Sequence, residues 1–138
     1  MTASSSPALL LPMAVLALWT LHVLIVVPIR RVRAGRAGLV SPEDFRLGES
    51  ERVPEFVKVP NRNFMNLLEL PVLFYVVGLM YYVAGRVDQT ALVLAWAYVA
   101  LRAIHSAIHL SYNNVVHRLT AYALSNAVLA AFWIVFFI

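Results

Sequence analysis

Apolar residues along the chain gather into four stretches that are separated by more polar segments. The stretches cover residues 7–29, 64–83, 90–110 and 119–138. Each is about 20 residues long, which is the length that a helix needs to cross a hydrocarbon core of about 30 Å. The pattern therefore predicts an all-α integral membrane protein, a four-helix bundle in which the spans make up a single domain over residues 1–138.

The longest polar segment, residues 34–63, predicts a loop between the first and second spans. It contains Pro42, Pro54 and Pro60 together with charged residues of both signs, a composition typical of a loop rather than of a second domain. Within it, residues 41–44 (Ser-Pro-Glu-Asp) predict a short helical start, because a serine cap is followed by proline and two acids.

Composition narrows the possible classes of function. The chain of 138 residues is 62% hydrophobic and 13% charged, which excludes a disordered tail and a soluble nucleic-acid-binding protein. It has no cysteine, so a disulfide, an iron–sulfur centre and a thiol nucleophile of its own are excluded. Nucleophilic or redox chemistry would have to come from a cofactor or a co-substrate.

Positive charge is unevenly distributed between the two sides of the predicted bundle. On one side only Arg86 is found, offset by Asp88, whereas the other side carries most of the basic residues. Since Lys and Arg stay in the cytoplasm, both termini are predicted to be non-cytoplasmic, in a bacterial inner membrane or the endoplasmic reticulum. The residues on the predicted cytoplasmic side are Arg30, Arg31, Arg33, Arg36, Arg46, Arg52, Lys58, Arg62 and Arg118.

Three of the spans carry polar residues at intervals of three and four positions. This spacing places them on one face of each helix. Ionisable groups inside a membrane are expensive, so they are candidates for function. The stripes are Arg62, Asn66 and Glu69 in the second span, Tyr98, Arg102, His105, His109 and Tyr112 in the third, and Arg118, Tyr122 and Ser125 in the fourth.

The depths of these stripes predict which residues meet. With about 1.5 Å of rise per residue, Glu69 lies about 12 Å and Arg102 about 15 Å from the cytoplasmic ends of their spans. The two side chains are therefore predicted to form a structural ion pair. Nearer the cytoplasm, a cationic cavity suited to an anionic ligand is predicted from Arg62, Asn66, His105, His109 and Arg118.

Two other interpretations of the same residues remain open. The polar stripes could serve only to hold helices together, in a non-enzymatic membrane scaffold or lipid-binding protein. Alternatively, His105 and His109 have a spacing found in metal sites, and His22 in the first span lies at a similar depth, so a haem or metal site could involve these three histidines.

With these stripes, the chain resembles the MAPEG family, the membrane-associated proteins of eicosanoid and glutathione metabolism. The resemblance rests on four motifs that follow one another along nearly the whole chain. Their pattern is similar to the microsomal prostaglandin E synthase branch and to bacterial members. The motifs are Ser41-Pro42-Glu43-Asp44, Arg62-x3-Asn66-x2-Glu69 followed by Pro71, Arg102-x2-His105 and Arg118-x3-Tyr122.

The resemblance implies a homotrimer in which glutathione, as a co-substrate, binds between subunits near the cytoplasmic face. The implied activity is that of a glutathione-dependent transferase or peroxidase acting on lipophilic electrophiles. In the implied reaction, Arg118 would stabilise the glutathione thiolate and Asp44 would lie near the acceptor substrate. The residues expected around glutathione are Arg33, Arg62, Asn66, Glu69, His105 and Tyr122, with His109 beside them. The sequence departs from the family pattern at Phe64, Met65, His109 and Leu119.

Overall fold

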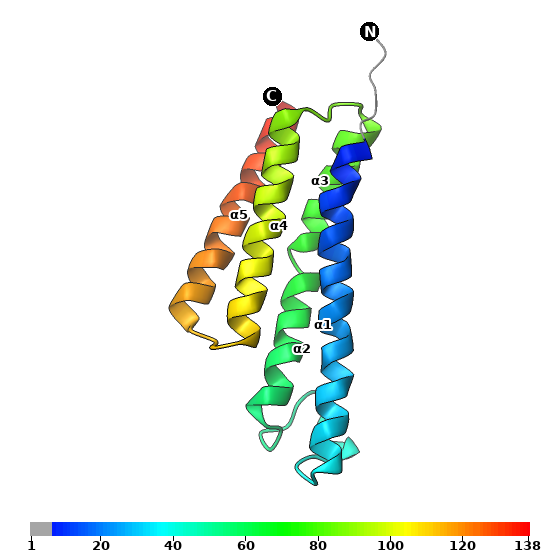
Figure 1. The fold of residues 1–138 in the computed structure, drawn as a ribbon, viewed down its shortest axis with the longest axis vertical. Helices are drawn as coiled ribbons and strands as arrows, with labels where there is room; N and C mark the ends of the chain where they lie inside the picture. The colour runs from blue at the N-terminus through cyan, green and yellow to red at the C-terminus, as the bar shows by residue number, and fades with distance from the viewer. Residues whose placement is uncertain (1–6) are drawn as a thin grey trace.

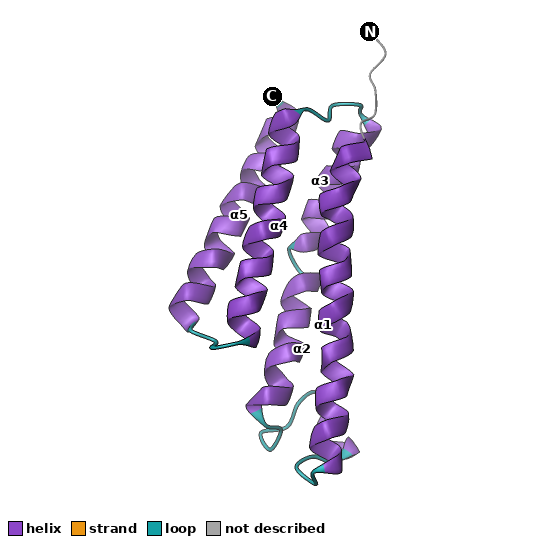
Figure 2. Ribbon diagram, viewed as in Figure 1, coloured by secondary structure: helices purple, strands orange, loops and turns teal. Residues whose placement is uncertain are grey.

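In a computed structural model of the chain, residues 7–138 are described, and this part contains only helices and the loops that join them (Figure 2). Its long helices lie side by side, with the start of the first and the end of the last at the same end of the bundle (Figure 1). Four segments are long and apolar enough to cross a membrane, so the predicted all-α, multi-pass architecture is confirmed. The first six residues of the predicted domain lie outside the described part. The elements are η1 (Pro7–Leu9), α1 (Leu10–Arg36), η2 (Pro42–Phe45), α2 (Glu55–Leu68), α3 (Pro71–Val83), α4 (Gln89–Leu110) and α5 (Val115–Phe137).

Several helices extend beyond the apolar stretches that predicted them. Helix α1 continues to Arg36, and α2 begins at Glu55, so the connection between them is residues 37–54 rather than 34–63. Hydrophobicity marks the part of a helix that lies in hydrocarbon, whereas Arg, Lys and Glu favour helix equally well outside it. Arg33 and Arg36 also lie in the last turn of α1, where positive charge stabilises the helix dipole.

The second span is divided into two helices, which the sequence analysis did not predict. Helix α2 ends at Leu68, Glu69 leaves the helical conformation with ψ −98°, and α3 starts at Pro71. Proline has no N–H and so cannot donate to the carbonyl of Leu67. The break also leaves the Asn66 carbonyl without a backbone donor among the described residues, and this carbonyl becomes important for the site below.

An aromatic cluster packs α3 against α4 and α5 in the half of the bundle away from the α4–α5 turn. Phe74 stacks on Tyr98 with ring centroids 4.7 Å apart, and Tyr81 stacks on Phe132 at 4.8 Å. All four rings are buried. The cluster fixes the positions of α4 and α5, which carry most of the polar stripe residues.

A polar contact joins three helices in the other half of the bundle. The hydroxyl of Ser106 on α4 accepts hydrogen bonds from Trp19 Nε1 on α1, at 2.9 Å, and from Asn63 Nδ2 on α2, at 2.6 Å. Ser106 and Asn63 are completely buried. We call this contact the Ser106 node; it sets the register of α1 and α2 against α4.

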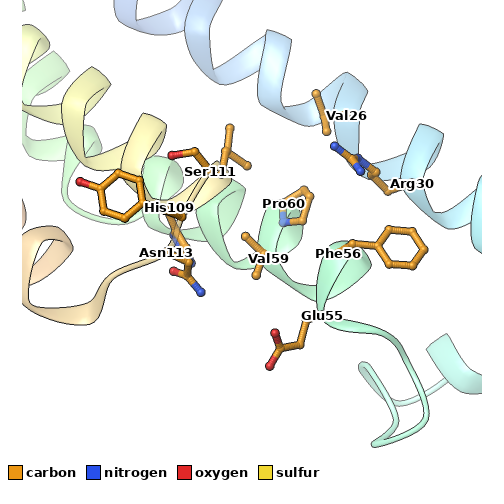
Figure 3. A pocket seen from close by; sticks show the side chains of 11 residues that line it. Val26, Arg30, Glu55, Phe56, Val59, Pro60, His109, Ser111 and Asn113 are labelled. Carbon is orange, nitrogen blue, oxygen red and sulfur yellow. The ribbon is translucent and has the colours of Figure 1, made fainter.

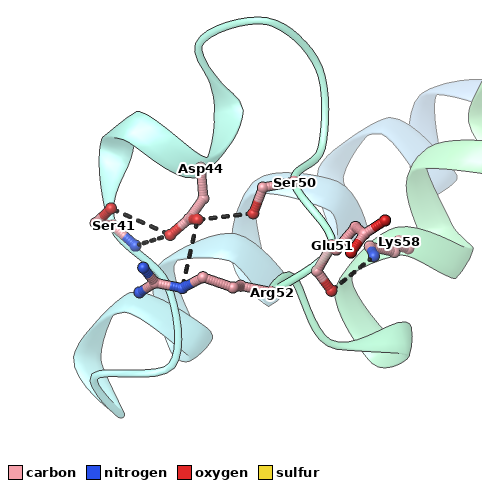
Figure 4. Close-up of polar contacts among 6 residues, drawn as sticks. All are labelled: Ser41, Asp44, Ser50, Glu51, Arg52 and Lys58. Carbon is pink, nitrogen blue, oxygen red and sulfur yellow. Dashed lines mark hydrogen bonds and ion pairs between the residues drawn. The ribbon is translucent and has the colours of Figure 1, made fainter.

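The connection between α1 and α2 is organised around Asp44. Its carboxylate accepts hydrogen bonds from the backbone N–H of Ser41, at 2.8 Å, and from the Ser50 hydroxyl, at 2.7 Å, and it faces Arg52 at 3.8 Å (Figure 4). The predicted short helical start is confirmed as η2, which begins at Pro42 directly after the Ser41 cap.

Candidate functional site

A cavity of about 440 Å³ lies between α2, α4 and α5, beside the α4–α5 turn. This volume is within the range of small-molecule sites. Seven of the residues that line it are ones that the stripes predicted; the other three, Met65, Val115 and Leu119, are apolar and exposed. The predicted seven are Arg62, Asn66, Glu69, His105, His109, Arg118 and Tyr122.

Helical spacing is what brings these side chains together, as the sequence predicted. His105 and His109 lie one turn apart on α4, with ring centroids 5.9 Å apart, and both are almost completely buried. The ring of Tyr122 on α5 lies 5.7 Å from that of His105. Two arginines, Arg62 and Arg118, line the same space, so the cavity is cationic and open to an anion.

Arg118 is held in place by a residue that the sequence analysis missed. Its Nη1 donates a hydrogen bond to Asn113 Oδ1 at 2.6 Å. Asn113 lies in the α4–α5 turn at φ 48°, a left-handed conformation that Asn tolerates better than most residues. The next residue, Asn114, caps α5 by accepting from the His117 N–H. In the sequence, the pair Asn113-Asn114 before the fourth span could have predicted this turn.

The predicted ion pair between Glu69 and Arg102 is not formed in the chain. Among residues 7–138 no ion pair joins them; Glu69 is exposed at the edge of the cavity, whereas Arg102 is completely buried. The guanidinium instead donates to the free carbonyl of Asn66 and lies 5.5 Å from the centroid of the Tyr122 ring. The prediction fails because the helix ends at Leu68, which leaves the Asn66 carbonyl free to accept from Arg102 in place of the Glu69 carboxylate.

Two residues that the resemblance assigned to the site lie elsewhere in the chain. Arg33 is exposed and lines an apolar groove of α1 with Leu24, Pro28 and Val32. Asp44 is buried in the α1–α2 connection, and its carboxylate is occupied by the contacts shown in Figure 4. Within one chain, Arg33 and Asp44 are therefore not part of the cavity.

The Asp44 contacts predict a pH dependence for this connection. Hydrogen bonds from Ser41 and Ser50 hold the pKa of Asp44 below its ordinary value of 3.8. A lowered pKa means that the stabilisation is present above the ordinary value and is lost as the pH falls towards the folded-state value. We expect hydrogen exchange in residues 41–53 to be slow at about pH 6 and faster, relative to intrinsic rates, below about pH 4.

The matched variants for this prediction are Asp44→Asn and Glu51→Gln. Asp44→Asn should give fast exchange at both pH values, because an amide cannot replace both accepting oxygens. Glu51 is exposed and its carboxylate makes no hydrogen bond or ion pair with the described residues, so Glu51→Gln should behave as the wild type. Wild-type protection that does not change with pH would contradict this account.

The histidines do not form the shared ligand set that the haem or metal interpretation needs. His22 is exposed on α1, and its ring contacts Trp19 of the same helix at 5.8 Å. It does not line the cavity that contains His105 and His109. Within residues 7–138 no group of three or more His, Asp or Glu side chains is placed to hold a metal ion.

The fold and the site together define a class: a four-span membrane bundle with a polar, cationic pocket at one end of its helices. The MAPEG family model matches residues 9–138, nearly the whole chain. The protein therefore belongs to the MAPEG family, whose members include glutathione transferases and peroxidases and commonly use glutathione. No curated protein and no solved structure matches the chain.

Proposed function

We propose that the protein is a glutathione-dependent transferase or peroxidase that acts on lipophilic electrophiles. The observation that supports this most directly is the convergence of Arg62, Arg118, Asn66 and the two histidines on one cavity. Arg62 would bind one of the two carboxylates of glutathione, which leaves Arg118 for the thiol, and Glu69 at the cavity edge would bind the ammonium group. The size of glutathione suits a cavity of 440 Å³.

In the proposed reaction, Arg118 stabilises the thiolate of bound glutathione. A neighbouring guanidinium lowers the pKa of a thiol, as cations do for cysteine. The sulfur then attacks an electrophilic carbon, a C–S bond forms, and the leaving group departs with its electron pair. The hydrogen bond that Arg118 donates to Asn113 Oδ1 fixes the guanidinium, so little reorganisation is needed when the charge develops.

The apolar side of the cavity supports an acceptor that comes from the bilayer. Met65, Val115 and Leu119 line the cavity together with its polar groups and are each about half exposed or more. An apolar molecule dissolved in the membrane would reach the thiolate along these residues. The bilayer would also concentrate such an acceptor relative to water.

The assembly and orientation that fit this function are also proposals. A second copy of the chain could bring its Arg33 to the cavity, which would explain an exposed arginine at the end of an apolar groove. The family resemblance favours a homotrimer for this purpose. By the distribution of Arg and Lys, the cavity would face the cytoplasm, where glutathione is abundant, and both termini would lie on the other side.

Binding of glutathione is the first result to be tested. Calorimetry on the protein in detergent should show saturable binding at millimolar glutathione. The diethyl ester of glutathione, which lacks both carboxylates, should bind at least about tenfold more weakly because its contacts to arginine lose their charge. Conjugation of a chromogenic aryl halide measures the reaction itself. Absence of binding at millimolar glutathione would refute the proposal.

A further inference from the structure

A second cavity of about 440 Å³ lies on the other side of α2, between α1, α2 and the end of α4 (Figure 3). Its lining comes from α1 (Val26, Arg30), from α2 (Glu55, Phe56, Val59, Pro60) and from the end of α4 with the turn that follows (residues 109–113). Arg30 directly follows the apolar stretch of α1, Glu55 is the first residue of α2, and Leu110 is the last residue of α4. The cavity is therefore at the level where the bilayer passes from hydrocarbon to headgroups.

The cavity carries one charge of each sign, and neither has a partner among the described residues. Arg30 on α1 and Glu55, the first residue of α2, both line it. Neither side chain forms an ion pair or a hydrogen bond with any residue in 7–138. Two unpaired charges of opposite sign on the walls of one cavity match a ligand that itself carries both signs.

The walls also offer unused hydrogen-bonding groups. Pro60 cannot donate to the carbonyl of Phe56, so this acceptor lacks its usual helical partner, and both residues line the cavity. His109 is 3% exposed, and its Nδ1 has no hydrogen-bond partner among the described residues. Buried polar groups normally have partners, so the His109 nitrogen favours a polar ligand over an empty space.

Apolar side chains line the cavity as well. Val26, Phe56 and Val59 lie on the two helices that flank the cavity. They would pack against hydrocarbon chains that run along α1 and α2 into the bilayer. The cavity thus combines a polar part for a charged group with an apolar part that continues into the membrane.

We propose that this cavity binds a zwitterionic phospholipid, with its phosphate on Arg30 and its ammonium group near Glu55 and the Phe56 carbonyl. The inference does not depend on the glutathione reaction, because Arg30 and Glu55 do not line the candidate active site. The two cavities meet only at His109, which lines both. The lipid would then form part of the wall behind the candidate site.

The test is native mass spectrometry of the purified protein after equilibration with equimolar phosphatidylethanolamine and phosphatidylglycerol, without glutathione. The wild type should retain phosphatidylethanolamine preferentially. Glu55→Gln should lower the ratio of retained phosphatidylethanolamine to phosphatidylglycerol about fivefold, because the ammonium loses its counter-charge. Arg30→Gln should lower retention of both lipids by about the same factor.

Glu51→Gln and Arg36→Gln are the matched controls, since both are exposed charges outside this cavity. They should leave retention and the ratio unchanged. Lipid retention that is equal in the wild type, Arg30→Gln and Glu55→Gln would overturn the proposal. So would a change of oligomeric state in these two variants with no change in lipid ratio, because it would show that another copy of the chain covers the cavity.

Discussion

Replacing Arg118 by alanine should reduce glutathione conjugation by about 100-fold or more while leaving the protein folded. A positioned cation or hydrogen-bond donor at a developing negative charge is typically worth about 100- to 1,000-fold in rate. Arg118 lies at the start of α5 and is partly exposed, and within residues 7–138 its side chain hydrogen-bonds only to Asn113. Its loss should therefore cost the structure little. Initial rates with a chromogenic aryl halide measure this effect.

Arg46→Ala serves as the control for this variant. Arg46 is an exposed arginine of the α1–α2 connection that does not line the candidate active site, so its removal should leave the rate unchanged. The same experiment separates the enzyme from the scaffold interpretation. If Arg118→Ala retained full activity, or if it dissociated the oligomer in detergent, the catalytic role assigned to Arg118 would be wrong.

Replacing Ser106 by alanine should lower the free energy of unfolding by about 1 to 3 kcal/mol. The substitution leaves Trp19 Nε1 and Asn63 Nδ2 without their acceptor, and Asn63 is completely buried. Hydrogen bonds between membrane helices contribute less than in water-soluble proteins, because the unfolded helices find other partners. Unfolding in a graded series of denaturing detergent, followed by helix content, measures the change.

Ser111→Ala is the matched control for the Ser106 node. The Ser111 hydroxyl is exposed and bonds only to carbonyls of its own helix, Ala107 and Ile108. Its removal should change stability by less than about 0.5 kcal/mol. Equal stability of Ser106→Ala and Ser111→Ala would show that the node does not set the packing of α1 and α2 on α4.

The sequence predicted the membrane bundle from the length of its apolar stretches, and most of the candidate site from helical periodicity. Residues 62, 66 and 69, or 105 and 109, share a helix face whatever the rest of the fold does, and antiparallel spans bring them to one depth. The seven predicted residues around the cavity follow from this. The ends of α1 and α2 beyond the apolar stretches could not be located in the same way. Hydrophobicity shows which residues lie in the bilayer, but it does not show where a helix begins or ends.

What the sequence did not predict depends on contacts between segments or on the path of the backbone. Glu69 and Arg102 were paired on the assumption of an unbroken second helix, whereas the break before Pro71 makes a backbone carbonyl the actual acceptor. Asn113 and Ser106 were missed because a single turn residue and a single serine carry no periodic signal. Each matters because of a hydrogen bond to a residue of another segment. Asn113 accepts from Arg118 on α5, and Ser106 accepts from Trp19 on α1 and Asn63 on α2.

The break in the second span has a consequence for the biogenesis of the protein. A chain is synthesised from its N-terminus, so the second span enters the bilayer before the third. An arginine at the centre of an inserting helix costs about 3 kcal/mol, and Arg102 is such a residue. The Asn66 carbonyl, which has no backbone donor, is already in the membrane as an acceptor when Arg102 arrives. The third span should therefore integrate as a partner of the second rather than independently.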